Sequence, residues 1–165
     1  MKATAGRILY ETLKAHGVAC LFGMEDPIQV FHAVDRSATK VVTVRDEKHG
    51  AIMAHGYAQA TGRPGVCAST SGPGATNLIT GLLEALQSSV LALVQDHPLR
   101  LKGRHAGSAL DHTAALAPFV KAVLRIDLPE RTAELTRTAL RIATSGRPGP
   151  VALLCPTDVM AAETE

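Results

Sequence analysis

Short apolar runs of strand length alternate along the chain with segments of helical periodicity, and this alternation limits the possible folds most strongly. Strands are expected at 18–22, 40–44, 65–69, 90–95, 122–126 and 151–154. Helices are expected from near the start to Ala15 and at 27–34, 47–60, 74–86 and 129–143, with a less regular stretch at 96–117. Because strands that are apolar throughout are buried on both faces, the pattern predicts a doubly wound α/β fold, with a mostly parallel sheet of about six strands and helices on both faces.

The composition fits a single folded domain over residues 1–165, because 46% of the residues are apolar and the formal net charge is only +2. Scattered basic residues and an aromatic content of 3% argue against a nucleic-acid surface or an anionic-membrane surface. No run reaches the roughly 18 apolar residues that span a bilayer, so we expect a cytoplasmic protein. Cys20, Cys67 and Cys155 lie in or beside apolar runs without a CxxC pair, which predicts buried, reduced thiols.

Three junctions between a strand and the following helix carry the candidate functional residues. They are residues 23–27, 45–49 and 70–77. In doubly wound sheets, ligands bind outside the carboxyl ends of the strands. The three junctions are therefore expected to share one edge of the sheet.

The third junction lies within the stretch STSGPGATN, in which two glycines flank Pro73. Glycine allows positive φ and a close approach of another group, while proline fixes φ and removes a donor. The stretch matches neither the Walker loop nor the GxGxxG pattern. From these letters alone, a ligand-contacting turn and an ordinary strand-to-helix turn are both open.

Glu47 is the second focus, because it lies where a strand ends and a helix begins, directly after Asp46 as the expected helix cap. It is either a catalytic acid in a pocket or an acid that complements the helix dipole. No metal site is expected, and neither HxxxH nor HExxH occurs. The histidines without a familiar ligand spacing, expected to be solvated or at the core edge, are His49, His55, His105 and His112.

The segment VRDEKHGAIMAHGYAQATGRPGVCASTSGPGATNLITGLLEAL closely resembles the amino-terminal, pyrimidine-binding domain of thiamine-diphosphate enzymes of the acetolactate synthase type. In that family a glutamate precedes a TSGPGATN turn at a fixed, ungapped spacing, and Glu47 and Thr70 keep it. LKAHGVACLFGM looks like the family's first helix and strand, and SGRPGPVALLCPTDV looks like its closing strand. The resemblance therefore covers most of the chain.

This resemblance implies that Glu47 contacts N1′ of the aminopyrimidine and promotes the tautomer that deprotonates thiazolium C2. A carboxyl group at a desolvated domain interface is expected to have a raised pKa and to share a proton with a ring nitrogen. The implied cofactor-binding residues are Met24, Thr70, Gly72, Pro73, Gly74 and Asn77.

The chain departs from the family pattern at three places. Asp46 stands where the family has a histidine, and residues 23–27 read GMEDP instead of GxPG. Gly107, Ser108 and Ala109 stand approximately where many members carry Phe-Gln-Glu. Decarboxylation of a small 2-oxo acid is the implied reaction, with carboligation as in acetolactate synthase left open.

Complete members also contain a second domain, which holds Mg²⁺ and the diphosphate through GDG and downstream asparagines. This chain contains no GDG, and Asn77 is its single asparagine. The resemblance therefore implies the α subunit of a split enzyme, similar to that of sulfopyruvate decarboxylase, with Mg²⁺ on a diphosphate-binding partner and an α2β2 assembly. A noncatalytic partner of a thiamine enzyme and a plain nucleotide or phosphate binder are the alternatives.

Overall fold

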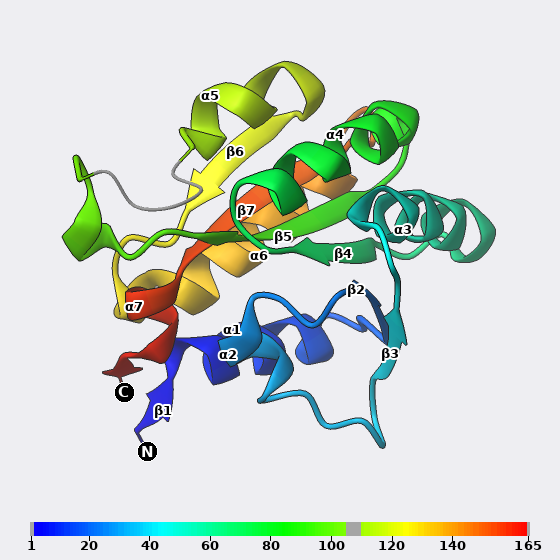
Figure 1. Ribbon diagram of the computed structural model, residues 1–165. Coiled ribbons are helices and arrows are strands. Elements are labelled where there is room, and N and C mark those ends of the chain that lie inside the picture. The colour runs from blue at the N-terminus through cyan, green and yellow to red at the C-terminus, as the bar shows by residue number, and fades with distance from the viewer. Residues whose placement is uncertain (1, 105–109, 165) are drawn as a thin grey trace.

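The computed structural model describes residues 2–104 and 110–164. Within these residues a six-stranded, all-parallel sheet has the order β3-β2-β4-β5-β7-β6 (Figure 1). Its strands are β2 (Cys20–Gly23), β3 (Lys40–Thr43), β4 (Gly65–Ser69), β5 (Val90–Asp96), β6 (Ala122–Arg125) and β7 (Val151–Pro156). The predicted doubly wound α/β fold is confirmed.

Helices cover both faces of the sheet (Figure 1). One face carries α1 (Ala5–Ala15), α2 (Ile28–Phe31), α6 (Thr132–Thr144) and α7 (Thr157–Ala161). The other face carries α3 (Glu47–Thr61), α4 (Pro73–Glu84) and α5 (His112–Leu116). Short 3₁₀ turns lie at Ala85–Gln87, Leu99–Leu101, Ala117–Phe119 and Pro129–Arg131. The sheet therefore separates two apolar clusters, one under each set of helices.

Local sequence signals explain the ends of α3, the helix that begins at the candidate site. The Asp46 carboxylate accepts a hydrogen bond from the Lys48 backbone N–H at 2.8 Å, so Asp46 is the cap that the sequence predicts. The helix ends at Gly62, whose φ of 68° is the left-handed conformation typical of a glycine stop.

The structure corrects several expected boundaries. The helix expected at 27–34 is the single turn α2, because the backbone beyond it tightens to i→i−3 bonds, from the Ala33 N–H to Val30 and from the Val34 N–H to Phe31. The helix expected at 129–143 starts as a 3₁₀ turn and becomes α-helical at Thr132. The less regular stretch 96–117 contains α5.

Three short elements were not expected at all. The strands β1 (Ala3–Thr4) and β8 (Glu163–Thr164) form a two-stranded antiparallel sheet that joins the ends of the described chain, and α7 follows β7. Each has too few residues to produce a periodic pattern. All three cysteines are buried free thiols, as predicted. In the part of the chain that the structure describes, no helix is both long and apolar enough to cross a bilayer.

Candidate functional site

Glu47 and the turn after β4 meet at the carboxyl edge of the sheet. Glu47 is the first residue of α3, and Gly74 lies in the first turn of α4. A Cβ atom added to Gly74 would lie 2.7 Å from Glu47 Oε1 and 2.6 Å from Thr70 Cγ2, closer than real Cβ contacts allow. Asn77, one turn further along α4, donates from Nδ2 to Glu47 Oε2 at 3.2 Å. The fold thus brings together Glu47, Thr70, Gly74 and Asn77.

The Glu47 carboxylate is buried, with 5% of the residue exposed, although it is ionisable. Its Oε2 atom has the Asn77 donor, whereas no residue within 2–104 and 110–164 donates a hydrogen bond to Oε1. Oε1 is not fully enclosed, because the completely buried side-chain atoms without a partner in the described residues are Gln29 Oε1, Ser69 Oγ and Thr132 Oγ1. The geometry therefore leaves one carboxylate oxygen beside Gly74 that can accept a hydrogen bond from a ligand.

The loop after β2 lies at the same edge. Burial and, secondarily, the negative charge of Glu47 raise the pKa of Asp26, so this loop is electrostatically coupled to the buried carboxylate. Met24, in the same loop, is 45% exposed. Nearly half of this residue is therefore within reach of a ligand.

Gly72 holds the sharpest bend of the turn, with φ 63° and ψ −114°, a region that side chains rarely adopt. Its backbone N–H donates to Nε2 of the buried His112 at 2.9 Å. His112 Nδ1 lies 2.8 Å from Asp96 Oδ1, and Arg125 Nε donates to Asp96 Oδ2 at 2.8 Å. The turn is thus supported from inside the domain by a chain of three side chains.

Asp96 anchors this chain as a carboxylate. Burial alone raises the pKa of Asp96, but the hydrogen bond with His112 and the charge of Arg125 outweigh burial, so the net pKa lies below the usual value. His112 was expected to be solvated or at the core edge, whereas it is fully buried. The sequence could have pointed to Asp96 as a functional residue, because it lies at the carboxyl end of β5 and functional side chains gather at strand ends in such sheets.

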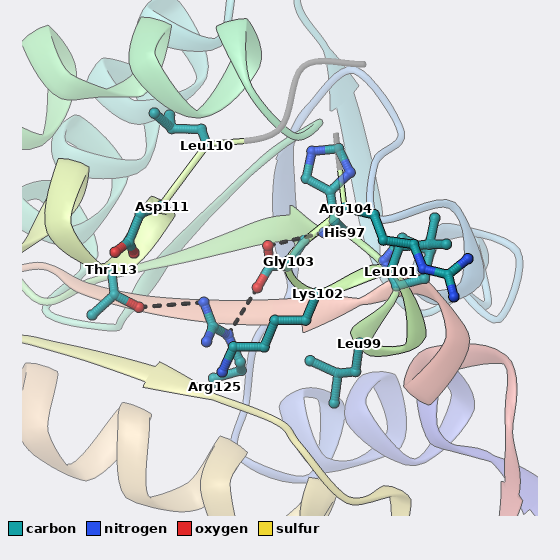
Figure 2. Close-up of a pocket in the computed structure, with 12 residues that line it drawn as sticks. His97, Leu99, Leu101, Lys102, Gly103, Arg104, Leu110, Asp111, Thr113 and Arg125 are labelled. Carbon is teal, nitrogen blue, oxygen red and sulfur yellow. Dashed lines mark hydrogen bonds and ion pairs between the residues drawn. The ribbon is translucent and has the colours of Figure 1, made fainter. Parts of the chain in front are cut away.

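A cavity of about 480 Å³ lies beside this chain of side chains. Figure 2 shows Lys102, Arg104 and Arg125 among the residues around it, with Arg125 directed toward Thr113 of α5, to which it donates at 3.4 Å. Asp96 also lines the cavity, so the cavity borders the side chains that support the turn. Its lining thus contains Lys102 and Arg104 besides Arg125, and the acidic side chains Asp96 and Asp111.

Some predicted features fall outside the described residues, namely His105 and the segment Gly107, Ser108 and Ala109. Among the residues that the structure does describe, no cluster of three or more His, Cys, Asp or Glu side chains could hold a metal ion.

Curated proteins similar to this chain include acetolactate synthases. The chain is 38% identical over 161 residues to a probable acetolactate synthase large subunit of Methanocaldococcus jannaschii, covering 95% of this chain and 27% of that protein. It is 37% identical over 166 residues to an acetolactate synthase of Arthrospira platensis, covering 96% and 29%. It is 36% identical over 157 residues to the chloroplastic acetolactate synthase of Arabidopsis thaliana, covering 92% of this chain and 23% of that protein. The chain therefore spans less than a third of the length of these relatives, and the matched part corresponds to their amino-terminal portion.

A sequence profile described as the N-terminal TPP-binding domain of thiamine pyrophosphate enzymes matches residues 3–115. The matched range contains Glu47, the turn at Gly72 and the supporting histidine at position 112. Thiamine pyrophosphate is thiamine diphosphate under its older name. Since the profile covers well over half of the sequence and the relatives agree with it, the chain belongs to the thiamine pyrophosphate enzymes, as an N-terminal TPP-binding domain of the acetolactate synthase type.

Proposed function

We propose that this chain is the pyrimidine-domain (α) subunit of a split thiamine-diphosphate enzyme that decarboxylates a small 2-oxo acid, with carboligation as a second outcome. The observation that carries the proposal is the buried carboxylate of Glu47, pressed against a residue without a side chain and left with one oxygen unbonded within the described residues. Such a group is suited to a ring nitrogen that gains or loses a proton.

The residues at this edge fit an aminopyrimidine ring. Gly74 provides bare backbone where a side chain would collide with Glu47, so a flat ring can approach closely. Glu47 Oε1 would accept from the protonated ring nitrogen, and Asn77 would keep Oε2 in place. The other residues proposed to line the ring are Met24, Thr70, Gly72 and Pro73.

When bound, thiamine diphosphate supplies the nucleophilic carbon and the electron sink that decarboxylation of a 2-oxo acid requires. The task of Glu47 would be to hold or release the proton at the ring nitrogen. A positioned acid or base of this kind contributes about 10² to 10⁴ in rate. Asn77 orients that carboxylate, because its amide fixes one oxygen and directs the other toward the ligand.

A diphosphate-binding partner subunit would hold Mg²⁺, in an α2β2 assembly. Support comes from the outer surface of α3 and α4, the two helices that begin at the site. Large apolar side chains are 39–50% exposed there, and a second polypeptide would cover them. They are Ile52 and Met53 on α3 and Leu83 on α4, and Leu86 lies in the 3₁₀ turn that follows α4.

The cavity next to Asp96 supports an anionic substrate, because Lys102 and Arg104 line it. It lies at the same sheet edge as the turn, and no acidic residue among those described forms an ion pair with Lys102 or Arg104 at its rim. The carboxylate of a 2-oxo acid would be attracted to this rim.

The test is steady-state decarboxylation of 2-oxo acids by the chain assembled with its diphosphate-binding partner, thiamine diphosphate and Mg²⁺. Glu47→Gln removes the titratable proton with little change in shape and should lower kcat by roughly 10²-fold or more. Glu11→Gln, an exposed acid on α1 at the opposite face of the sheet, is the matched control and should leave kcat unchanged.

The alternatives predict different results. Full activity of Glu47→Gln would show that the chain is a noncatalytic partner. The remaining alternative, a plain nucleotide or phosphate binder, is tested by calorimetry on the chain alone. Tight binding of a nucleotide without any partner would support that alternative.

A further inference from the structure

We propose that His112 is a positioning residue for the thiamine site, which holds the Gly72 N–H from inside the domain and so fixes the turn that places Gly74 against Glu47. The inference rests on the proposed function for its consequence in catalysis. The contacts that carry it belong to this chain alone.

Both ring nitrogens of His112 are engaged, and their partners fix its protonation. The Gly72 backbone N–H, 2.9 Å from Nε2, can only donate, so Nε2 carries no proton and accepts. The ring proton is therefore on Nδ1, from which it is donated to Asp96 Oδ1 at 2.8 Å. His112 is 0% exposed, so no water competes for either nitrogen. The imidazole is thus held as a single neutral tautomer.

The contact between His112 and Asp96 is consequently a hydrogen bond from a neutral ring, even though the distance fits an ion pair. The cation that balances the Asp96 carboxylate is Arg125, whose Nε lies 2.8 Å from Oδ2. Because Arg125 is already present, the imidazole does not need to carry a charge. This arrangement keeps Nε2 available for Gly72.

The Gly72 amide lies two residues before Gly74, so a shift of Gly72 would also move Gly74. Gly72 is the cap of α4, and its carbonyl accepts from the Thr76 N–H at 3.1 Å, so both of its backbone polar groups are held. Pro73 follows and has no N–H of its own. Gly74 comes next, and Glu47 Oε1 lies 2.7 Å from the place that a Cβ atom of this residue would occupy. A movement of Gly72 therefore changes the distance between Gly74 and the carboxylate.

The first experiment reads the hydrogen bond directly and does not depend on activity. Imidazole ¹⁵N spectra of the full chain should show His112 as the neutral tautomer with the proton on Nδ1. The Gly72 amide proton should shift upfield in His112→Leu and return toward the wild-type position in His112→Gln, whose Oε1 can replace Nε2 as acceptor. A protonated ring, or a proton on Nε2, would overturn the proposal.

The second experiment measures thiamine diphosphate dependence in the complex with the partner subunit. His112→Leu leaves the buried Gly72 N–H without an acceptor and should raise the KM for thiamine diphosphate about tenfold, equivalent to about 1.4 kcal/mol. His112→Gln should recover most of that loss. His112→Asn keeps a polar group only at the Nδ1 position and should resemble His112→Leu, which preserves the test if the leucine variant fails to fold.

A packing control separates positioning from general destabilisation. Leu116 is fully buried on the same helix, α5, and takes no part in the hydrogen bonds. Leu116→Ala should lower the free energy of unfolding without changing the KM for thiamine diphosphate in the folded complex. An equal KM change in Leu116→Ala would overturn the positioning role.

Glu47→Gln distinguishes failure of this inference from failure of the proposed function. If Glu47→Gln abolishes activity while His112→Leu leaves the KM unchanged, the positioning role is wrong and the proposed function stands. If the predicted spectra are found but Glu47→Gln has no effect on activity, the proposed function is wrong, and with it the role of His112 at a thiamine site.

Discussion

The face of the sheet under α1 and α6 and the contact between α3 and α4 on the other face are packed with side chains of different size. The face under α1 and α6 has large residues at its centre, including Leu9, Tyr10 and Leu13, all with at most 1% exposed. On the other face Leu78, Leu82 and Leu116 are also fully buried, but where α3 meets α4 the contact is between small residues, Ala51 and Gly81. The difference shows how one domain combines a stable core with a precisely spaced site.

Small residues allow the backbones of α3 and α4 to come close. A Cβ atom added to Gly81 would lie 2.5 Å from Ala51 Cβ and 2.7 Å from the Lys48 carbonyl oxygen. Because both helices start at the carboxyl edge of the sheet, their separation also sets the separation of Glu47 and Gly74. Large side chains stabilise the first face by removing apolar area from water. Substitutions on the two faces should therefore separate stability from activity.

The largest expected effect is on the face with large side chains. Leu13→Ala, in α1, should lower the free energy of unfolding by about 3 kcal/mol, since it deletes a side chain that is 1% exposed and leaves a cavity. Activity per folded molecule should stay near the wild-type value. Urea denaturation and kcat of the assembled enzyme measure the two quantities.

The control for Leu13→Ala is Leu128→Ala, because Leu128 is 52% exposed and its truncation should cost little. A large loss of kcat in folded Leu13→Ala would contradict the division of roles between the two faces.

The next effect concerns the start of α4. Gly74→Ala should lower kcat about 10²-fold, or about 2.7 kcal/mol, because the new Cβ displaces either Glu47 or Thr70 and a shift of about 1 Å in a catalytic group has that cost. The free energy of unfolding should fall by less than in Leu13→Ala. Steady-state kinetics and urea denaturation compare them.

Gly56→Ala is the matched control, since Gly56 is an exposed helical glycine in α3 and an added Cβ meets nothing within 4 Å. It should keep full activity and gain about 0.4–1 kcal/mol in stability. Wild-type kinetics in Gly74→Ala would mean that the contact with Glu47 does not set the site.

The sequence alone predicts the frame of this site. The apolar runs locate the six strands of the parallel sheet, and the rule that parallel strands share a carboxyl edge brings Glu47 and the turn before Asn77 together before any coordinates are known. The roles of these residues toward the cofactor stay predictions.

The support behind the turn could not be predicted in the same way. Asp96, His112 and Arg125 lie on β5, α5 and β6, and their contacts depend on how three separate elements pack. The one-turn helix α5 is too short for an apolar period, although Asp111 caps it through the Ala114 N–H at 3.1 Å. No local sequence pattern distinguishes a buried histidine from a solvated one, so the burial of His112 becomes evident only in the fold.

The smallest effect is expected further along the layer of small residues. Gly81→Ala should lower the free energy of unfolding by roughly 1–2 kcal/mol, because overpacking against Ala51 and the Lys48 carbonyl outweighs the gain of a helical alanine. Gly81 lies about two turns after Gly74, so the helices would separate at a distance from the site, and kcat should fall several-fold, less than in Gly74→Ala. If Gly81→Ala instead stabilises the chain as Gly56→Ala does, the spacing of α3 and α4 is set by something other than their small side chains.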